Sequence, residues 1–385
     1  MRWTPRPPAA RRRVARGGRA TAMEAVGVHA VRAGRIASVA LAVVALLGAA
    51  GCSWTGSAEA GSAVRASSDT AVPDEGAGSG DSAPTSATPT PSTSANPTPT
   101  TADVHAKRFA PGVANEASGV AAATGNPDAF FVVDDPTGVD GVVAVDGNGT
   151  LLARISVTGM SAGNAEALAA GPCGSTPIAD SAEPPAGDAR CLYAGDIGDQ
   201  IGRDRVTIYR FAEPTLSPPP DGPVHADAWQ YTYPDQPQDA ESLLVDTDGS
   251  LLIITKPAHG QGPVAAHRVY RGKPGGGELE KVGEFSPPEP PAALQSLFTG
   301  NVVTDAAATP GRVLLLTYDQ VIEYVAADPT APLATFFTWP QHNLPKPEQI
   351  QSEGITPTDD GCGYAIVSEG GPGGGAGSIA VVPCR

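Results

Sequence analysis

From about residue 105 to the C-terminus, short runs of aliphatic and β-branched residues alternate with turns rich in Gly, Pro, Asp and Asn. Typical runs are FFVV at 130, LLIIT at 251 and VLLLT at 313. No stretch in this region shows the 3.6-residue spacing of an amphipathic helix. The pattern therefore predicts an all-β fold.

The runs recur in a fixed order in five units. Each unit opens with an acidic residue followed by small and apolar residues, then continues with a stiff apolar strand and a third strand. Four strands per unit at this spacing predict a β-propeller with five four-stranded antiparallel blades, and one long interval leaves room for a sixth. The opening acids, spaced 50, 75, 64 and 48 residues apart, are Glu116, Glu166, Glu241, Asp305 and Glu353.

Four of the units have a candidate fourth strand, which in the fourth unit is ATFFTW at 334. The fifth unit lacks one at the C-terminus. We expect AKRFAP, residues 106–111, to supply it and so to close the ring with an N-terminal strand. An open propeller would leave strand edges exposed, which gives a physical reason for the two ends to meet.

The first 51 residues have the composition of an export signal. They hold nine arginines against one acid, Glu24, and end in an uncharged apolar run from Ser38 to Ala50. Thirteen residues are too few for a membrane-spanning helix, which needs about 20. The length fits the apolar core of a signal peptide instead, and Met23 is an alternative start.

The run closes on Leu47-Gly48-Ala49-Ala50-Gly51-Cys52, which resembles the bacterial lipobox. In that motif small residues precede the cysteine whose thiol carries the lipid, for example palmitate. We therefore expect residues 1–51 to be a lipoprotein signal peptide and Cys52 to be the lipidation site. Ordinary secretion, with Cys52 as a free or paired thiol, is the alternative.

Residues 52–104 consist mainly of Ser, Thr, Ala, Pro, Gly and Asp. Such a segment has too little apolar surface to offset its conformational entropy, and its prolines favour extended conformations. It predicts a disordered tether between a membrane anchor and a propeller domain at 105–385. The expected location is the extracytoplasmic face of the cell membrane.

Without the basic leader the chain is strongly acidic. From Cys52 onward 16 basic residues face 40 acidic ones, a net charge of −24. Binding to nucleic acid needs clustered cations, and no such cluster is present. Nucleic acid is therefore excluded as an expected partner.

Four cysteines remain after Cys52, and an even number in an exported chain predicts disulfide bonds. Three pairings are possible. The pairs Cys173–Cys191 and Cys362–Cys384 are favoured because each brackets one local segment.

Four longer segments stand out in the chain: EASGVAAATGNPDAFFVVDD, CLYAGDIGDQIGRDRVTIYRF, DAESLLVDTDGSLLIITK and SEGITPTDDG. Together they resemble a group of largely uncharacterised exported propeller lipoproteins of high-GC bacteria, distantly similar to phytase-like calcium-binding propellers. The resemblance covers roughly residues 113–385 and implies the propeller fold, with little indication of biochemistry.

The repeated acids are the first candidates for a functional site. If each acid opens an innermost strand, the five carboxylates converge at one end of the ring, where they repel one another unless a cation or a basic group lies among them. Calcium takes six to eight such oxygen ligands, and Asp196 and Asp199 offer more. Structural hydrogen bonding between blades is the alternative role. Arg203 and Arg205 could neutralise the nearby carboxylates or form an anion site.

Two functions follow. The first is a binding or scaffold module for an unknown envelope or extracellular ligand, because no complete catalytic set assembles. The G-x-S-x-G run at 159–163, for instance, lacks the following helix that a nucleophile elbow needs. The second is a calcium-assisted hydrolase, an esterase or phosphoesterase, acting at the mouth of the channel. The sequence leaves open whether the chain is an enzyme.

Overall fold

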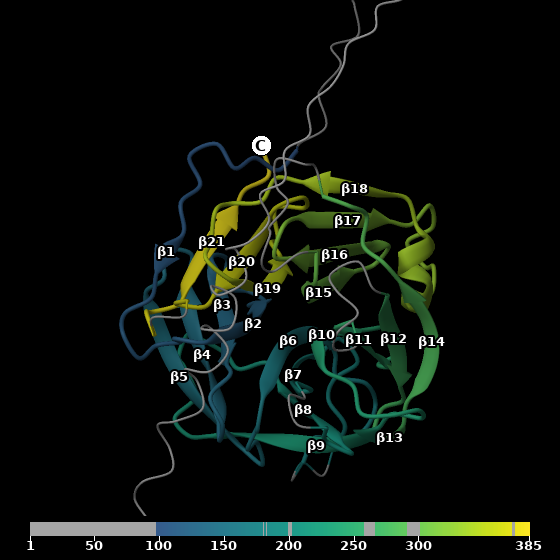
Figure 1. The fold of residues 1–385 in the computed structure, drawn as a ribbon. Helices are drawn as coiled ribbons and strands as arrows, with labels where there is room; N and C mark the ends of the chain where they lie inside the picture. Colours follow the sequence, from purple (N-terminus) through teal and green to yellow (C-terminus); the bar gives the residue numbers. More distant parts are fainter. Residues whose placement is uncertain are drawn as a thin grey trace, which may run out of the picture. The chain divides into compact units, whose positions relative to one another are not determined.

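The computed structural model describes residues 98–385 apart from 180, 182, 199–201, 258–265, 291–300 and 372–373. Cys52 and Asp199 lie outside these described residues. The described strands form five four-stranded antiparallel sheets arranged around a common centre, which confirms the five-bladed propeller (Figure 1). No helix among the described residues is long and apolar enough to cross a membrane.

The blades follow one another along the chain. Blade 1 comprises β2 (Ala117–Ala122), β3 (Ala129–Asp134), β4 (Gly141–Asp146) and β5 (Leu151–Thr158). Blade 2 comprises β6 (Ala165–Pro172), β7 (Arg190–Asp196), β8 (Val206–Ala212) and β9 (Val224–Thr232). Blade 3 comprises β10 (Ala240–Val245), β11 (Leu251–Thr255), β12 (His267–Gly272) and β14 (Glu280–Phe285).

Blade 4 comprises β15 (Val303–Thr309), β16 (Arg312–Thr317), β17 (Val321–Val325) and β18 (Gln341–Leu344). Blade 5 comprises β19 (Ser352–Pro357), β20 (Tyr364–Ser368), β21 (Ser378–Val382) and the N-terminal β1 (Lys107–Arg108). The first strand of each blade lies innermost and packs against its counterparts in the two neighbouring blades.

The ring closes as the sequence predicts. In β1, Lys107 pairs with Ile379 and Arg108 with Ser378 of β21, so an N-terminal strand completes the last blade. The folded part begins earlier than residue 105, because the Thr98 backbone N–H donates to the Arg385 carbonyl over 2.8 Å. Both ends of the described chain therefore meet in one sheet.

The hydrophobic core is divided among the five joints between blades. Each sheet faces a neighbour on both sides, so both faces of its inner strands are apolar. At the joint of blades 4 and 5, for example, Leu314 and Leu316 pack with Ile355 and Ile366. Gly119 permits the close approach of β2 and β6, because a Cβ atom there would lie 2.2 Å from the Leu168 backbone nitrogen.

Two joints are also linked by hydrogen bonds at the outside of the ring. Strand β5 pairs in parallel with β9, and β9 pairs in parallel with the two-residue strand β13 (Gly277–Glu278). Blades 1, 2 and 3 are thus connected along their outer strands as well as through their cores.

One expected strand is wrong. The ATFFTW run at 334 forms a short 3₁₀ helix, η2 (Leu333–Thr338), and the fourth strand of blade 4 is the polar β18 that follows. The Thr335 hydroxyl donates to the Pro332 carbonyl over 2.8 Å, which favours a turn. Phe336 is buried against Phe285 and Tyr324, so its apolarity reflects packing between blades 3 and 4.

Both expected disulfides, Cys173–Cys191 and Cys362–Cys384, are present, which confirms the favoured pairing. Cys173–Cys191 links the segment after the innermost strand β6 to the second strand β7, and Cys362–Cys384 links the segment after β19 to the chain just beyond the third strand β21. Both therefore lie toward the end of the ring at which the innermost strands finish.

Candidate functional site

Every innermost strand carries a β-bulge near its start, where one residue is skipped in the pairing with the second strand. A bulge turns the extra side chain away from the regular ladder and is often found beside functional sites. The five skipped residues occupy equivalent places around the ring, and we call them the bulge ring. They are Ser118, Glu166, Glu241, Thr304 and Glu353.

Three of the five predicted acids, Glu166, Glu241 and Glu353, are therefore equivalent and buried. Glu116 is exposed two residues before the bulge of blade 1, and its backbone N–H donates to the Asp134 carboxylate over 2.7 Å. Asp305 follows the bulge of blade 4 and accepts a hydrogen bond from the Ile355 backbone N–H over 2.8 Å. The structure thus assigns Asp305 to the joint of blades 4 and 5.

A second ring of equivalent residues lies beside the bulge ring. It is not among the positions predicted from the sequence. The residue directly after each second strand completes it, and we call these residues the exit ring. They are Asp135, Ile197, Lys256, Tyr318 and Glu369. Aligning the ends of the stiff apolar runs (VVDD, AGDI, IITK, LLTY, IVSE) would have revealed this position.

In blades 1, 2 and 5 a short polar residue fixes the chain just before the exit-ring residue. The Asp196 carboxylate accepts a hydrogen bond from the Asn164 backbone N–H over 2.9 Å, and the Ser368 hydroxyl accepts one from the Gln351 backbone N–H over 3.0 Å. These bonds tie the end of the second strand to the start of the first. The bulge ring and the exit ring therefore share one end of the molecule, which we call the acidic end.

Lys256 is the main counter-charge at the acidic end. Its ammonium group forms an ion pair with Glu241 and lies 3.8 Å from the Asp239 carboxylate. Burial opposes the charge on Lys256, but Glu241, Asp239 and Glu166 outweigh it and raise the pKa of this lysine. Burial in turn raises the pKa of Glu241 well above its usual value, although Lys256 opposes this.

The other carboxylates hold protons more tightly than usual. Burial, reinforced by the charge of Asp135, raises the pKa of Glu166 to about 8. Burial, reinforced by Glu353, raises the pKa of Glu369 to about 7. Burial and Glu116 raise the pKa of Asp135 to about 6. At neutral pH the acidic end therefore presents both protonated and ionised carboxyl groups, which can donate and accept hydrogen bonds.

One carboxylate oxygen of Glu353 accepts a hydrogen bond and the other does not. Glu353 is only 3% exposed, and its Oε1 accepts a hydrogen bond from the Tyr318 hydroxyl over 2.9 Å. Its buried Oε2 has no hydrogen-bond partner among the described residues. Burial raises the pKa of Glu353, while Tyr318 and Gln351 lower it. A buried acceptor without a partner is costly and calls for an explanation.

Lys346 approaches the same group from the segment that leads into β19. It is half-buried between Pro345 and Pro347, and the Tyr364 hydroxyl holds this segment by donating to the Pro345 carbonyl. Burial lowers the pKa of Lys346 to about 8, although Asp319 and Glu353 oppose the shift. Within the described part of the chain Lys346 forms no ion pair.

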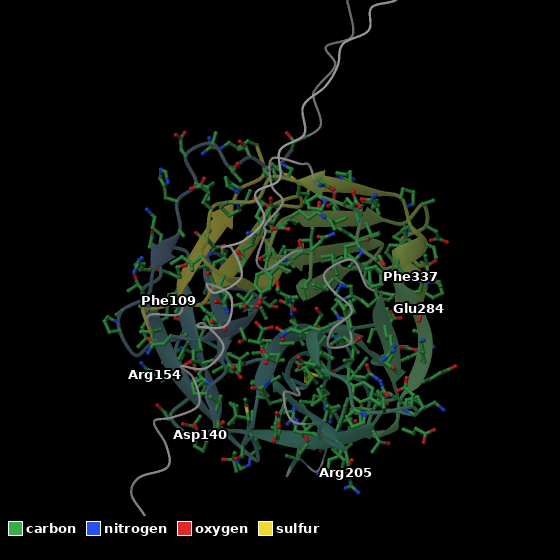
Figure 2. All side chains as sticks on the ribbon, in the orientation of Figure 1. Phe109, Asp140, Arg154, Arg205, Glu284 and Phe337 are labelled. Atoms are coloured by element: carbon green, nitrogen blue, oxygen red, sulfur yellow. A yellow bond between two sulfur atoms is a disulfide. The ribbon has the colours of Figure 1, made fainter. Side chains whose placement is uncertain are left out.

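The Asp196 loop is neutralised internally. The Arg203 guanidinium donates to the Asp196 carboxylate over 2.7 Å and to the backbone carbonyl of Gly198. Arg205 points away to the outside of the ring, where it donates to the Gln230 side chain over 3.2 Å (Figure 2). The two arginines therefore do not combine into one anion site.

Calcium binding at the acidic end stays a prediction, since the predicted ligand Asp199 lies outside the described residues. Calcium requires six to eight converging oxygens. Among the residues that the structure describes, no group of three or more His, Cys, Asp or Glu side chains is arranged to hold a metal ion. We therefore derive no step through calcium.

The opposite end of the ring contains a cavity of about 640 Å³. All five innermost strands line it near their ends, with small and apolar residues such as Ala122, Ala170, Leu244 and Ala308. Asp188 and Thr358 contribute polar groups at its rim. We call this the cavity end, and its volume falls within the range of roughly 300–1,000 Å³ that is typical of small-molecule sites.

No protein-family model and no curated protein matches the chain. Among solved structures, a GH43_1 enzyme from Xanthomonas citri is similar with a TM-score of 0.42 and 11% identity over 72% of this chain and 90% of that one. Virginiamycin B lyase from Staphylococcus aureus has a TM-score of 0.35 and 9% identity over 73% and 99%. Glutaminyl cyclase from Myxococcus xanthus has a TM-score of 0.35 and 12% identity over 73% and 97%. No functional property is transferred from these proteins.

Proposed function

We propose that this chain is an extracytoplasmic, lipid-anchored binding module whose acidic end binds a small ligand that carries a positive charge. The observation that supports this most directly is Glu353 Oε2, a buried acceptor without a partner. A ligand that donates a hydrogen bond to this oxygen removes the penalty of burying it unsatisfied. The scaffold around it is a propeller module, in which all five blades contribute to one site.

The charge balance supports a cationic ligand. The bulge and exit rings bring five carboxyl groups together, and the close counter-charge is Lys256, which already pairs with Glu241. The carboxyl groups are Asp135, Glu166, Glu241, Glu353 and Glu369. Burial, reinforced by mutual repulsion, raises the pKa values of Asp135, Glu166 and Glu369, so a bound cation would relieve repulsion and stabilise the folded state.

The binding site is tested with methylammonium, the smallest carbon-bearing ammonium probe. We expect its addition at millimolar concentrations to raise the melting temperature of the wild-type protein at pH 7.5, because a ligand that binds only the native state stabilises it. Glu353→Gln should abolish the rise. Glu280→Gln, which changes an exposed carboxylate on the outer strand β14, is the matched control and should retain it. An equal rise in wild type and Glu353→Gln would refute the site.

Calcium is tested separately, because a calcium-assisted hydrolase is the alternative function that the sequence suggests. A rise in melting temperature at micromolar calcium that a chelator reverses, and that Glu166→Gln or Glu241→Gln weakens, would favour that alternative. An unchanged melting curve over micromolar to millimolar calcium would leave the binding module as the better proposal.

The anchor is tested independently of the ligand. Cys52→Ser should move the protein from the membrane pellet to the soluble fraction, because a thiol at this position is needed for lipid attachment. Intact-mass analysis of the wild-type protein should show the added lipid. A soluble wild-type protein without lipid mass would contradict the anchor and would leave the ligand site untouched.

A further inference from the structure

The cavity end of the ring surrounds a space that its own side chains do not fill. Three innermost strands contribute alanines near their ends, Ala122 in β2, Ala170 in β6 and Ala308 in β15. With such short side chains in the lining, the ring leaves a volume of about 640 Å³ open. A cavity of this size holds a small organic molecule, and its mainly apolar lining favours a hydrocarbon group over water.

The wall of the cavity is fixed by contacts between neighbouring blades. The Thr356 hydroxyl accepts a hydrogen bond from the Ala122 backbone N–H over 3.1 Å, which ties β19 to β2. Gly171 lets β6 approach β10 closely, because a Cβ atom at this position would lie 2.6 Å from the Val245 side chain. The blades already touch at these two joints, so the cavity does not close by a further approach of these blades.

Two segments at the rim of the cavity are anchored beside the disulfides. Next to the first disulfide, the Ala189 carbonyl accepts a hydrogen bond from the Cys173 backbone N–H over 3.0 Å. Next to the second, the Asp360 carboxylate accepts a hydrogen bond from the Cys384 backbone N–H over 2.8 Å. A rim that is already ordered reduces the entropy lost when a ligand binds.

The rim carries more negative than positive charge. Three acids, Asp188, Asp246 and Asp359, and a single cation, Arg190, are among the described residues that line the cavity. Arg190 is neutralised by an ion pair with Glu213 over 3.3 Å. The side chains of Asp188 and Asp359 are exposed and form neither a hydrogen bond nor an ion pair within the described part of the chain. The rim therefore attracts a positive group and repels a negative one.

We propose that the cavity end binds a lipophilic amine, with its hydrocarbon part inside the cavity and its ammonium group at the rim. Removal of the hydrocarbon part from water supplies most of the affinity, and the charge of the rim selects the head group. This site is independent of the proposed cation site, because the two sites are formed by opposite ends of the innermost strands.

The experiment uses three probes that share one hydrocarbon part and differ in the head group. They are 4-phenylbutylamine, 4-phenylbutanol and 4-phenylbutyrate, titrated into the full chain by calorimetry at pH 7.5, where the amine is protonated. We expect the amine to bind about tenfold more tightly than the carboxylate, with the alcohol between them. A carboxylate that binds as tightly as the amine would overturn the assigned ligand class.

The head-group preference is tested at the two exposed rim acids. Asp188→Asn/Asp359→Asn should bring the amine and the carboxylate within about threefold of each other and should leave the alcohol within about twofold of its wild-type affinity. Asp140→Asn/Asp204→Asn, which removes two exposed acids outside the cavity lining, is the matched control and should retain the wild-type order. An undiminished preference in the first double variant would contradict the role of the rim.

The position of the hydrocarbon part is tested by filling the cavity. Ala308→Phe should weaken all three probes about tenfold or more, and Ala170→Leu is a second filling variant if circular dichroism shows that the first does not fold. Glu353→Gln should leave all three probes within about twofold. An amine that is lost in Glu353→Gln but retained in a filling variant would overturn this inference and support the cation site at the acidic end. Absence of binding by all three probes would overturn this inference and leave the cation site untouched.

Discussion

The two ends of the ring are built from the same five innermost strands but are held by different chemistry. At the acidic end, ion pairs and hydrogen bonds among buried carboxyl groups, Lys256 and Tyr318 join the blades. At the cavity end, the lining is small and apolar, and the two disulfides lie on this side. The stability of one end therefore depends on the protonation of buried carboxyl groups, while the other end is braced covalently.

The comparison is tested most strongly at Lys256. Lys256→Met should lower the free energy of unfolding by about 3–5 kcal/mol, because removing one partner of a buried ion pair leaves Glu241 uncompensated. Urea unfolding at pH 7 measures the loss. The double variant Glu241→Gln/Lys256→Met should recover most of it. A loss below about 1 kcal/mol in the single variant would show that this pair does not hold the acidic end.

The disulfides give the second largest effect. Replacing Cys173 and Cys191 with Ser should lower the free energy of unfolding by about 3 kcal/mol, because a cross-link over a loop of this length restricts the unfolded chain. The loss should be equal at pH 5 and pH 8, since no titrating group is involved. A loss that differs between the two pH values would show that the two ends are coupled.

The acidic end should respond to pH. Glu166 has a folded pKa of about 8 against an ordinary value of 4.5, so between these values the folded protein binds more protons than the unfolded chain. Stability should therefore fall as pH rises from about 5 to 8 and change little above that. Glu166→Gln should flatten the decline in urea titrations. A rise in stability over this range would contradict the raised pKa.

The cavity end should give the smallest effect. Ala308→Val adds two methyl groups to the cavity lining, where there is room for them, and should change the free energy of unfolding by less than about 1 kcal/mol. The change should be the same at every pH. A loss above about 2 kcal/mol would show that this part of the cavity closes in solution.

The sequence predicts the frame well, because the frame depends on patterns that recur along the chain. Stiff apolar runs mark the second strands in all five blades, and the closing strand at Lys107–Arg108 follows from the need to cover an edge. The polar strand β18 is not predicted, because its pairing with β17, and not its composition, makes it a strand. Phe336 misleads for the opposite reason, since an apolar residue in a turn can be buried as deeply as one in a strand.

The site is predicted only in part. Glu166, Glu241 and Glu353 are found from their spacing, but Glu116 and Asp305 miss the equivalent position by two residues and one. The bulges set this register, and a single sequence does not show where a bulge occurs. Lys346 could not be found, because it occupies no repeated position and its partial burial depends on how the segment before β19 packs.

The joining of the two chain ends has a mechanical consequence. The backbone of Thr98 and Arg385 exchanges two hydrogen bonds, and the pairs of β1 with β21 follow within ten residues. A load applied to the N-terminal segment therefore acts first on this seam, and a pull along the strand axis strains its bonds together rather than one by one. The Cys362–Cys384 bond then passes the load to β20 through covalent bonds. The resistance of this seam to force is therefore set by its rate of unfolding and not by the equilibrium stability of the ring.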